Sequence, residues 1–151
     1  MQRIIPFLWF DDQAVEAATF YTEVFPNSSV TGIMGPADAP MGVDFVLDGL
    51  RCRALNGGPV FSLTEAFSMW VTAETQEEID YYWSSLTAGG GEESQCGWLK
   101  DRFGLSWQIV PPILEQLLAD PDPGASGRVM QAMLGMRKLV IADLLAARDA
   151  A

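Results

Sequence analysis

The stretch IIPFLWFDDQAVEAATFYTEVFPN, residues 4–27, decides the fold of this chain. It opens with an apolar run from Ile4 to Phe10 that is rich in aromatic and β-branched residues. A run this short predicts a strand with both faces covered rather than a helix. Asp11 or Asp12 then offers a carboxylate that can cap a helix, and apolar residues recur at helical spacing until the proline near the end of the stretch. The stretch therefore predicts a strand followed directly by a helix.

Three further strands are predicted after this helix. Residues 29–34 form a short strand pattern, and residues 43–47 and 51–55 flank Asp48-Gly49, a pair favoured in tight hairpin turns. The run Asn56-Gly57-Gly58-Pro59 breaks the pattern. The first part of the chain is thus predicted to be one strand–helix–three-strand unit.

The same order recurs in the second half. Residues 67–73 predict a strand, and Thr75-Gln76-Glu77-Glu78 is a capping box that starts a helix. Gly89-Gly90-Gly91 ends that helix, and residues 98–111 predict a second hairpin. Aligning Trp9 with Trp70 aligns the first strands of the two halves, so the chain contains two βαβββ modules. We therefore expect one α+β domain over residues 1–151, with modules at about 3–59 and 66–112.

The tail, residues 113–151, has a different pattern. A short helix is predicted over 113–118, a linker over 120–124, and a further helical region from Gly127 onward. Apolar residues gather on one face of this region. That face covers either the protein's own core or a second subunit, and the sequence leaves both alternatives open.

Composition excludes several classes of function. The chain of 151 residues has a net charge of −11, with 20 acidic and 9 basic residues, so it does not suit a nucleic-acid or anionic membrane partner. No apolar run approaches the roughly 20 residues that span a bilayer, and the first residues lack the pattern of a signal peptide. The two cysteines, Cys52 and Cys96, form no CxxC motif and are expected to be reduced. A cytoplasmic location is the expectation.

A tandem βαβββ repeat resembles the vicinal oxygen chelate superfamily, which includes glyoxalase I, extradiol dioxygenases and bleomycin-resistance proteins. Phe20-Tyr21 in the first helix and residues 101–109 are similar to recurrent patterns of that superfamily. The resemblance implies a glyoxalase-like fold, in which the modules form a cupped mixed sheet, and it implies a homodimer.

A narrower resemblance, over essentially the whole chain, is to the PhnB-like family, often labelled 3-demethylubiquinone-9 3-methyltransferase. The segments that carry it are 6–10, 57–59, 96–104, 106–111 and 128–134. Relatives commonly have a histidine after the Gly-Gly-Pro, where this chain has Val60. The methyltransferase label itself finds no support, because the Gly-rich turn between a strand and a helix that such cofactor sites use is missing.

The resemblance also implies metal-ligand positions, which fall near Pro6, Arg53, Phe67 and Gln108. Proline and phenylalanine cannot bind a metal, arginine is cationic, and the chain has no histidine. Only Gln108 could serve as a ligand, and one neutral amide makes a poor site. We therefore expect no metal and no cofactor.

Few residues remain for acid–base or nucleophilic chemistry. Cys52 and Cys96 have no histidine partner, so both are expected to be inert, although the cation of Lys100 follows Cys96 closely. Lys100, Asp101 and Arg102 are predicted at a solvated hairpin tip. Glu65 and Gln108 are the weak catalytic candidates, and Glu65 is either a solvated loop residue or a group at the mouth of a pocket.

The remaining prediction is a ligand pocket on the concave side of the sheet. Residues of the same parity on a strand share a face. The predicted pocket residues are Leu8, Phe10, Arg53, Met69 and Gln108, with Asn56 and Trp98 near the rim. Aromatic walls with one cation and one amide suit a small ligand, although the same residues could simply fill a core.

Three functions follow from these patterns. The first is a metal-free homodimer that binds a small molecule. The second is an enzyme acting on a small oxygenated substrate with an atypical metal site or none. The third is a structural or regulatory dimer without a ligand. The missing metal ligands favour the first.

Overall fold

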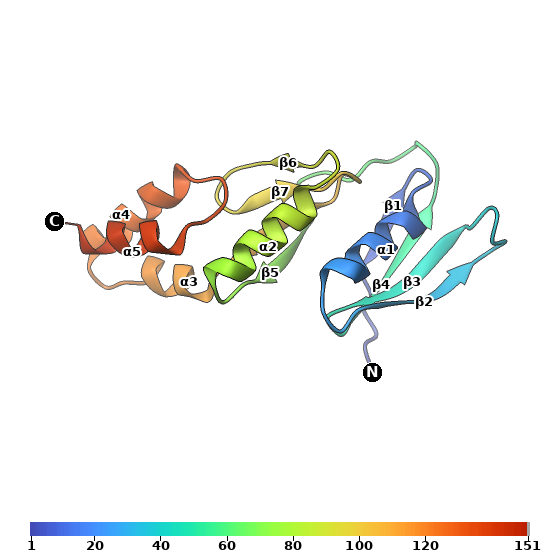
Figure 1. The fold of residues 1–151 in the computed structure, drawn as a ribbon, viewed down its shortest axis with the longest axis horizontal. Coiled ribbons are helices and arrows are strands. Elements are labelled where there is room, and N and C mark those ends of the chain that lie inside the picture. The colour runs from blue at the N-terminus through green and yellow to red at the C-terminus, as the bar shows by residue number, and fades with distance from the viewer. Residues whose placement is uncertain (151) are drawn as a thin grey trace. The chain divides into compact units, whose positions relative to one another are not determined.

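The computed structural model describes residues 1–150, and the contacts along the chain divide it into two compact units, Met1–Thr64 and a second unit that begins at Glu65. Each unit contains one four-stranded mixed sheet with a helix along one face (Figure 1). The α+β class and the repeated order of elements predicted from the sequence are confirmed.

The first unit follows the predicted order of strand, helix and three strands. Its elements are β1 (Phe7–Phe10), α1 (Ala14–Val24), β2 (Ser29–Met34), β3 (Gly42–Leu47) and β4 (Leu50–Asn56). The sheet order is β1-β4-β3-β2, with β1 parallel to β4 and the other pairs antiparallel. The β3–β4 hairpin turns at Asp48-Gly49, where both residues have positive φ, as the favoured turn pair requires.

Alanines allow α1 to pack closely on its sheet. Ala14, Ala17 and Ala18 are fully buried on the helix, and Tyr21 lies beside Phe45 of β3 with ring centroids 6.5 Å apart. Small side chains let a helix backbone approach a sheet, and the aromatic pair then fills the remaining space. This packing fixes which face of the first sheet is covered.

The predicted cap of α1 is wrong. Neither Asp11 nor Asp12 caps the helix, and Gln13, which stands at the cap position, makes no side-chain cap bond. Instead the Oδ1 atom of Asn56 accepts a hydrogen bond from the Ala14 backbone N–H at 2.8 Å. The end of β4 lies at the start of α1 in the folded unit, so a tertiary contact supplies the cap that local sequence does not.

The second unit repeats this arrangement. Its sheet elements are β5 (Ser68–Thr72), α2 (Gln76–Thr87), β6 (Glu92–Glu93), β7 (Trp98–Lys100) and β8 (Ser106–Val110). The sheet order β5-β8-β7-β6 matches that of the first unit, again with the first and last strands parallel. At the start of α2, Thr75 Oγ1 accepts from the Glu78 N–H, which confirms the predicted cap. Gly89 and Gly90, both with positive φ, follow the end of α2 as predicted.

Asp101 is a structural residue rather than a solvated charge. It is only 3% exposed. Its carboxylate accepts hydrogen bonds from Phe103 N, Leu105 N and Trp107 Nε1 at 2.8, 3.1 and 2.8 Å. The prediction of a solvated tip is therefore wrong for this residue, because the carboxylate holds the turn between β7 and β8 from inside.

Three helices form the tail: α3 (Pro112–Leu118), α4 (Pro123–Leu134) and α5 (Ile141–Asp149). Helix α4 begins inside the predicted linker, because Asp122 caps it by accepting from Gly124 N–H and Pro123 occupies the first turn. No helix of residues 1–150 is long and apolar enough to cross a membrane.

The apolar face of the tail packs within its own unit. Buried residues from the three helices and from the segment between α4 and α5 join Val110 of β8 in one cluster: Leu114, Leu117, Val129, Leu139 and Leu144. Cys96 and Gly97 donate backbone hydrogen bonds to Met136 O and Arg137 O, which ties the tail to the strand region. Of the two alternatives for the apolar face, these residues fit the first, because they cover the core of their own unit. Met130 and Leu134 remain 40% and 50% exposed.

Candidate functional site

Strand register defines the open face of the second sheet. Residues paired across neighbouring strands project to the same face. One row therefore consists of Glu92, Lys100, Ser106 and Ser68, and the next of Trp98, Gln108 and Trp70. The opposite face is covered by α2, since Glu93 Oε1 accepts a hydrogen bond from Trp83 Nε1 of that helix at 2.6 Å. The open face thus carries one polar row and one row of two indoles flanking an amide.

The amide row contains two of the predicted pocket residues. Gln108 and Trp98 are partly exposed on this face. Trp70, which is not among the predicted pocket residues, is 51% exposed beside Gln108. Gln108 Nε2 donates to Ser68 Oγ at 3.0 Å. That bond fixes the orientation of the amide and leaves its oxygen as an acceptor for a ligand.

Met69 lies on the other face. It pairs with Trp107, which is buried on the α2 side of the sheet. The prediction that Met69 shares a face with Gln108 is therefore wrong. The partner of Gln108 is Trp70. The observed register of the parallel strands β5 and β8 differs by one residue from the register that would pair Met69 with Gln108.

Lys100 and Glu65 form an ion pair on the edge of the polar row. Their Nζ and Oε1 atoms lie 2.5 Å apart. The hydrogen bond from Lys100 lowers the pKa of Glu65, and the same bond raises the pKa of Lys100. A carboxylate with a lowered pKa is a weaker general base, so the pair suits charge complementarity better than proton transfer.

Ser106 occupies the middle of the polar row and is only 1% exposed. Its hydroxyl is the one buried side-chain oxygen or nitrogen within residues 1–150 that has no hydrogen-bond partner. An unmet buried hydroxyl costs about 1–3 kcal/mol, so its presence calls for an explanation. Ser106 helps to line a cavity of about 110 Å³, whose other walls are Glu65, Glu92, Glu93, Ser94, Trp98, Leu99 and Lys100.

In the first unit, the predicted pocket residues lie on two different faces of the sheet. Leu8 and Phe10 are 2% and 5% exposed and lie on the face covered by α1, level with Ala54 and Asn56 of β4. Arg53 instead pairs with Phe7 on the open face. The prediction that Leu8 and Phe10 share a face with Arg53 is therefore wrong. Alternation along one strand shows which of its residues share a face. Only the register between two parallel strands shows which residues of the two strands lie on the same face of the sheet.

Asn56 is also committed to structure. Besides capping α1, its Nδ2 donates to Pro40 O at 3.0 Å. Both ends of the amide are thus occupied by backbone groups. Asn56 therefore lies on the helix side of β4, where it holds the unit together. The prediction that it lies at the rim of a pocket on the open face is wrong.

Arg53 carries its own counter-ion. Its Nε and Nη2 atoms contact the two carboxylate oxygens of Asp44 at 2.6 and 3.3 Å. The hydrogen bond from Arg53 lowers the pKa of Asp44. The signal for this pair was present in the sequence, because a two-residue turn at Asp48-Gly49 places Asp44 opposite Arg53.

Trp9 closes the Gly-Gly turn beside the open face of the first unit. Its Nε1 donates to Gly58 O at 3.0 Å, and its ring meets Phe61 edge to face at 5.0 Å. A Cβ on Gly57 would lie 2.3 Å from the Trp9 ring, so only glycine fits there. This contact explains the Gly-Gly-Pro break in the sequence.

The structure corrects the alignment of the two modules. Trp9 pairs with Leu55, whereas Trp70 pairs with Gln108. With the tryptophans superimposed, Leu55 therefore corresponds to Gln108. Arg53 corresponds to Ser106, so the two implied ligand positions Arg53 and Gln108 are not equivalent in the two modules.

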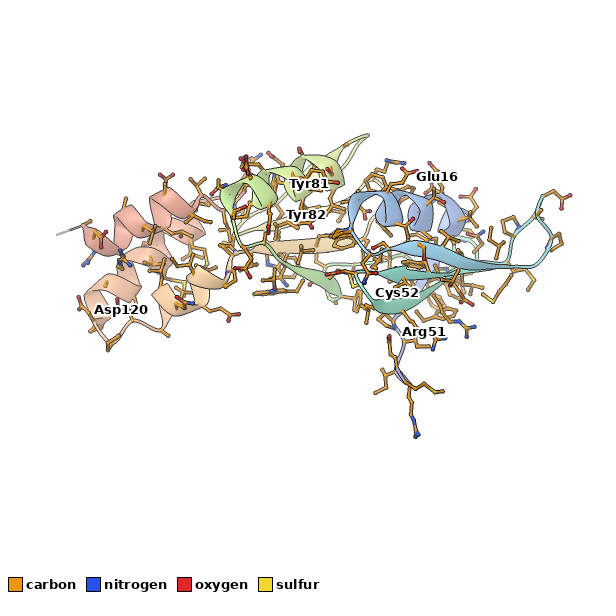
Figure 2. All side chains as sticks on the ribbon, turned by 60° about the horizontal axis from the view of Figure 1, so that its bottom comes forward. Glu16, Arg51, Cys52, Tyr81, Tyr82 and Asp120 are labelled. Carbon is orange, nitrogen blue, oxygen red and sulfur yellow. The ribbon has the colours of Figure 1, made fainter. Side chains whose placement is uncertain are left out.

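The donor set does not fit a metal ion. Pro6 and Phe67 offer no side-chain ligand, and Arg53 is bound to Asp44. In the part of the chain that the structure describes, no three His, Cys, Asp or Glu side chains gather as a metal site would require. Burial raises the pKa of Cys52 to about 11, so this thiol, which lies within the first unit (Figure 2), does not suit nucleophilic chemistry.

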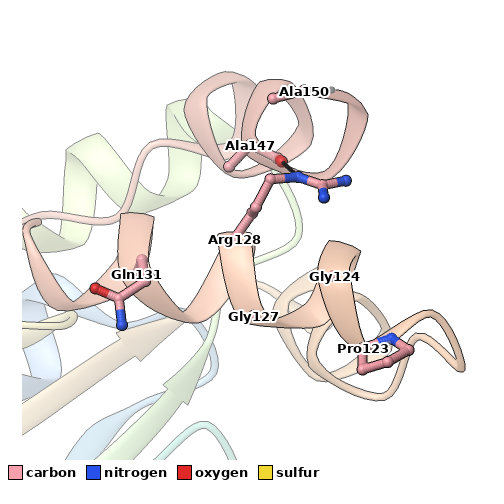
Figure 3. Close-up of a pocket in the computed structure, with 7 residues that line it drawn as sticks. All are labelled: Pro123, Gly124, Gly127, Arg128, Gln131, Ala147 and Ala150. Carbon is pink, nitrogen blue, oxygen red and sulfur yellow. Dashed lines mark hydrogen bonds between the residues drawn. The ribbon is translucent and has the colours of Figure 1, made fainter.

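A wider depression of about 590 Å³ lies beside α4 and α5 in the tail. Arg128 reaches from α4 to the end of α5, where its Nε and Nη2 atoms donate to Ala147 O and Arg148 O at 2.9 and 2.6 Å (Figure 3). These bonds satisfy carbonyls at a helix C-terminus, which is a structural role. The rest of the lining consists of small side chains and Gln131.

Comparisons with known proteins place this fold. The protein described as a putative 3-demethylubiquinone-9 3-methyltransferase, PhnB protein, from Bacillus cereus is 30% identical, with a TM-score of 0.67, over 73% of this chain and 99% of its own. PA1353 from Pseudomonas aeruginosa is 16% identical with a TM-score of 0.61, over 74% and 98% of the two chains. The fosfomycin resistance protein FosX from Listeria monocytogenes is 18% identical with a TM-score of 0.58, over 76% and 94%. The latter two likenesses show the fold alone.

Residues 2–110 match a family model, while no curated protein matches the chain. The matched range covers both sheets and stops before α3, so the resemblance predicted for residues 128–134 lies outside it. The resemblance to the PhnB-like family is confirmed for the two modules, and the structural neighbours confirm the glyoxalase-like fold. The chain belongs to the family described as 3-demethylubiquinone-9 3-methyltransferase.

Proposed function

We propose that this protein is a homodimer that binds a small oxygenated molecule without a metal ion. The observation that carries the proposal is the row Trp98–Gln108–Trp70 on the open face of the second sheet. Two indoles supply apolar surface, and the amide oxygen of Gln108, held by the bond from its Nε2 to Ser68, accepts one directed hydrogen bond. Sites of this kind, mostly aromatic with few placed polar groups, are typical of small-molecule binding.

We propose binding without a metal ion because the side chains at the implied ligand positions are poor metal ligands. The chain has no histidine, and a lone amide at Gln108 is a weak ligand for any divalent ion. One structure of FosX is described as a complex with Mn(II) and sulfate. Metal analysis of the purified protein by mass spectrometry is the test, and a stoichiometric, tightly held divalent ion would contradict the proposal.

The homodimer is supported by exposed aromatic residues around the open sheet faces. Phe7 is 55% exposed in the first unit, and Phe67 and Trp70 are 44% and 51% exposed in the second. Large apolar side chains exposed on a small protein often mark an interface. Sedimentation velocity at micromolar concentration measures the mass directly, and a monomer at all concentrations would contradict this part of the proposal.

The binding site has a direct test with a matched control. A panel of small carboxylates, diols and hydroxyketones is titrated while tryptophan fluorescence is recorded. Gln108→Ala should weaken the best member of the panel about tenfold, because one hydrogen bond to a charged or strongly polar group is lost. Gln116→Ala, an exposed glutamine on α3, should change nothing. Equal loss in both variants would contradict the assigned site.

An enzyme is the second candidate, and the cavity beside Ser106 is the observation that favours it. A hydroxyl and an ammonium–carboxylate pair in one cavity offer groups that could act on a substrate. Turnover that is lost in Glu65→Ala or Gln108→Ala would support this candidate. Methyl transfer is not proposed: Gly89 to Gly91 follow the end of α2 rather than joining a strand to a helix.

A structural or regulatory dimer without a ligand is the third function. It predicts that no small molecule perturbs Trp70, Trp98 or Gln108 in solution. The same titration therefore separates this function from the first.

A further inference from the structure

The cavity beside Ser106 has an excess of negative charge. Its lining includes three acidic residues, Glu65, Glu92 and Glu93, and one basic residue, Lys100, although the carboxylate of Glu93 is bound to Trp83 on the α2 side of the sheet. Lys100 is already paired with Glu65, and the Glu93 carboxylate accepts from Trp83 and lies 3.7 Å from Arg137. Glu92 faces Lys100 across the β6–β7 pair and is exposed. The carboxylate of Glu92 therefore adds a negative charge that Lys100, bound to Glu65, does not fully offset.

Ser106 supplies an independent observation that points to a ligand. Its hydroxyl is buried and unpartnered, while the same strand pairing that places Lys100 and Glu92 on the cavity side places Ser106 there too. Neighbouring polar side chains are otherwise engaged: the hydroxyl of Ser68, its partner on β5, accepts from Gln108. A polar ligand atom at this point would satisfy a hydroxyl that the protein leaves unsatisfied.

Trp98 completes the cavity wall. An indole ring attracts a cation, and Trp is the best side chain for this interaction. The volume of about 110 Å³ admits a small group and excludes a large one, since one water takes roughly 30 Å³ of liquid volume. Charge, hydroxyl and ring all favour the same chemistry, a compact cation that donates hydrogen bonds.

We propose that this cavity takes the primary ammonium group of the ligand, with one N–H donated to Ser106 Oγ and others to the Glu65 and Glu92 carboxylates. The inference rests on the proposed function, because Trp98 belongs to both sites. It adds the ligand class: an amine whose oxygenated part lies on the row of Trp98, Gln108 and Trp70.

The test uses matched probes on the full-length protein. Propylammonium, propionate and propanol have the same carbon chain and differ in the polar end. Each is titrated at neutral pH into isotopically labelled protein, with backbone amide shifts as the readout. Propylammonium should give saturable shifts at Ser94, Trp98, Lys100 and Ser106, whereas propionate should give none there.

Three variants locate the interaction. Ser106→Ala should weaken propylammonium about tenfold, the loss of a hydrogen bond to a charged group, and its fold should persist because no partner is lost. Glu92→Gln should weaken it about threefold, as expected for an exposed charge pair. Glu115→Gln, an exposed carboxylate on α3, is the control for general attraction to an acidic protein and should have no effect.

The outcomes separate the two proposals. If propylammonium binds equally well to Ser106→Ala, or if Glu115→Gln weakens it as much as Glu92→Gln, the inference is overturned. If propionate or propanol perturbs the cavity and propylammonium does not, the ligand class is wrong while the proposed binding function stands. If no probe perturbs the cavity, the inference fails. The proposed function also fails if the wider panel leaves Gln108 unperturbed.

Discussion

The side-chain oxygen of Asn56, at the end of β4, accepts a hydrogen bond from the backbone N–H of Ala14, at the start of α1, at 2.8 Å. The same amide donates to Pro40 O. One side chain thus joins a strand end, a helix start and the loop before β3. This contact makes the helix N-terminus depend on the tertiary structure of the whole first unit.

Asn56→Ala should destabilise the protein by about 1–2 kcal/mol, because a helix cap and a second bond to the backbone are both lost. Urea denaturation followed by circular dichroism measures the change. Asp12→Ala is the matched control, since the carboxylate there is exposed and does not cap α1. A larger loss in Asp12→Ala than in Asn56→Ala would contradict the assignment of the cap.

Asp101→Ala should cost about 3 kcal/mol or more. Its buried carboxylate accepts from two backbone N–H groups and from Trp107, and each donor left unpaired carries a desolvation cost. Thermal denaturation of the purified variant gives the measurement. Asp38→Ala in the exposed loop before β3 should be neutral, and equal stability of the two variants would show that Asp101 is solvated after all.

Gly57→Ala should displace the Trp9 ring, since the added methyl group would lie 2.3 Å from it. Overpacking of this kind costs about 1–3 kcal/mol, and tryptophan fluorescence should change because the Nε1 bond to Gly58 O is broken. Gly58→Ala is the comparison: nothing lies within 4 Å of its Cβ, and only its positive φ is unfavourable. Its stability should fall by about 1 kcal/mol with unchanged fluorescence.

Cys52 should make the protein lose stability at alkaline pH. Burial raises the pKa of its thiol from 9.0 to about 11, so between these values the unfolded chain has released a proton that the folded chain retains. Stability therefore falls as pH rises through this window, by at most about 3 kcal/mol. Cys52→Ala should remove this part of the pH dependence in urea titrations from pH 8 to 11. An unchanged slope would indicate that Cys52 is accessible in the folded protein.

Local patterns in the sequence predicted the elements because the interactions that make them are local. The capping box at Thr75, the glycines after α2 and the tight turn at Asp48-Gly49 all act within a few residues. Hydrophobic runs of strand length gave the strands, and their repetition gave two modules. The antiparallel pairing of Asp44 with Arg53 also follows from a turn of fixed length.

The faces of the sheets were decided by tertiary structure. Whether Leu8 or Phe7 lies beside Arg53 depends on the register of β1 against β4, two parallel strands separated by a helix and a hairpin. No turn links them directly, so no local spacing of residues fixes the register. A one-residue offset moves every side chain to the other face, which is why Gln108 and Trp98 lie on the open face and Met69 does not.

The sequence by itself thus determined the family and the two modules, since these depend on residue identity and local spacing. Only the tertiary structure decided that Asn56 caps a helix, that Asp101 is buried, and that an unpartnered Ser106 lies beside Lys100. The Asn56 cap requires two segments far apart along the chain to meet, whereas the Asp101 bonds and the Lys100–Ser106 pair lie within the β7–β8 hairpin, where packing against the rest of the unit decides which groups are buried. Whether each of these polar groups stabilises or destabilises the protein depends on its burial, and no local pattern of residues specifies burial.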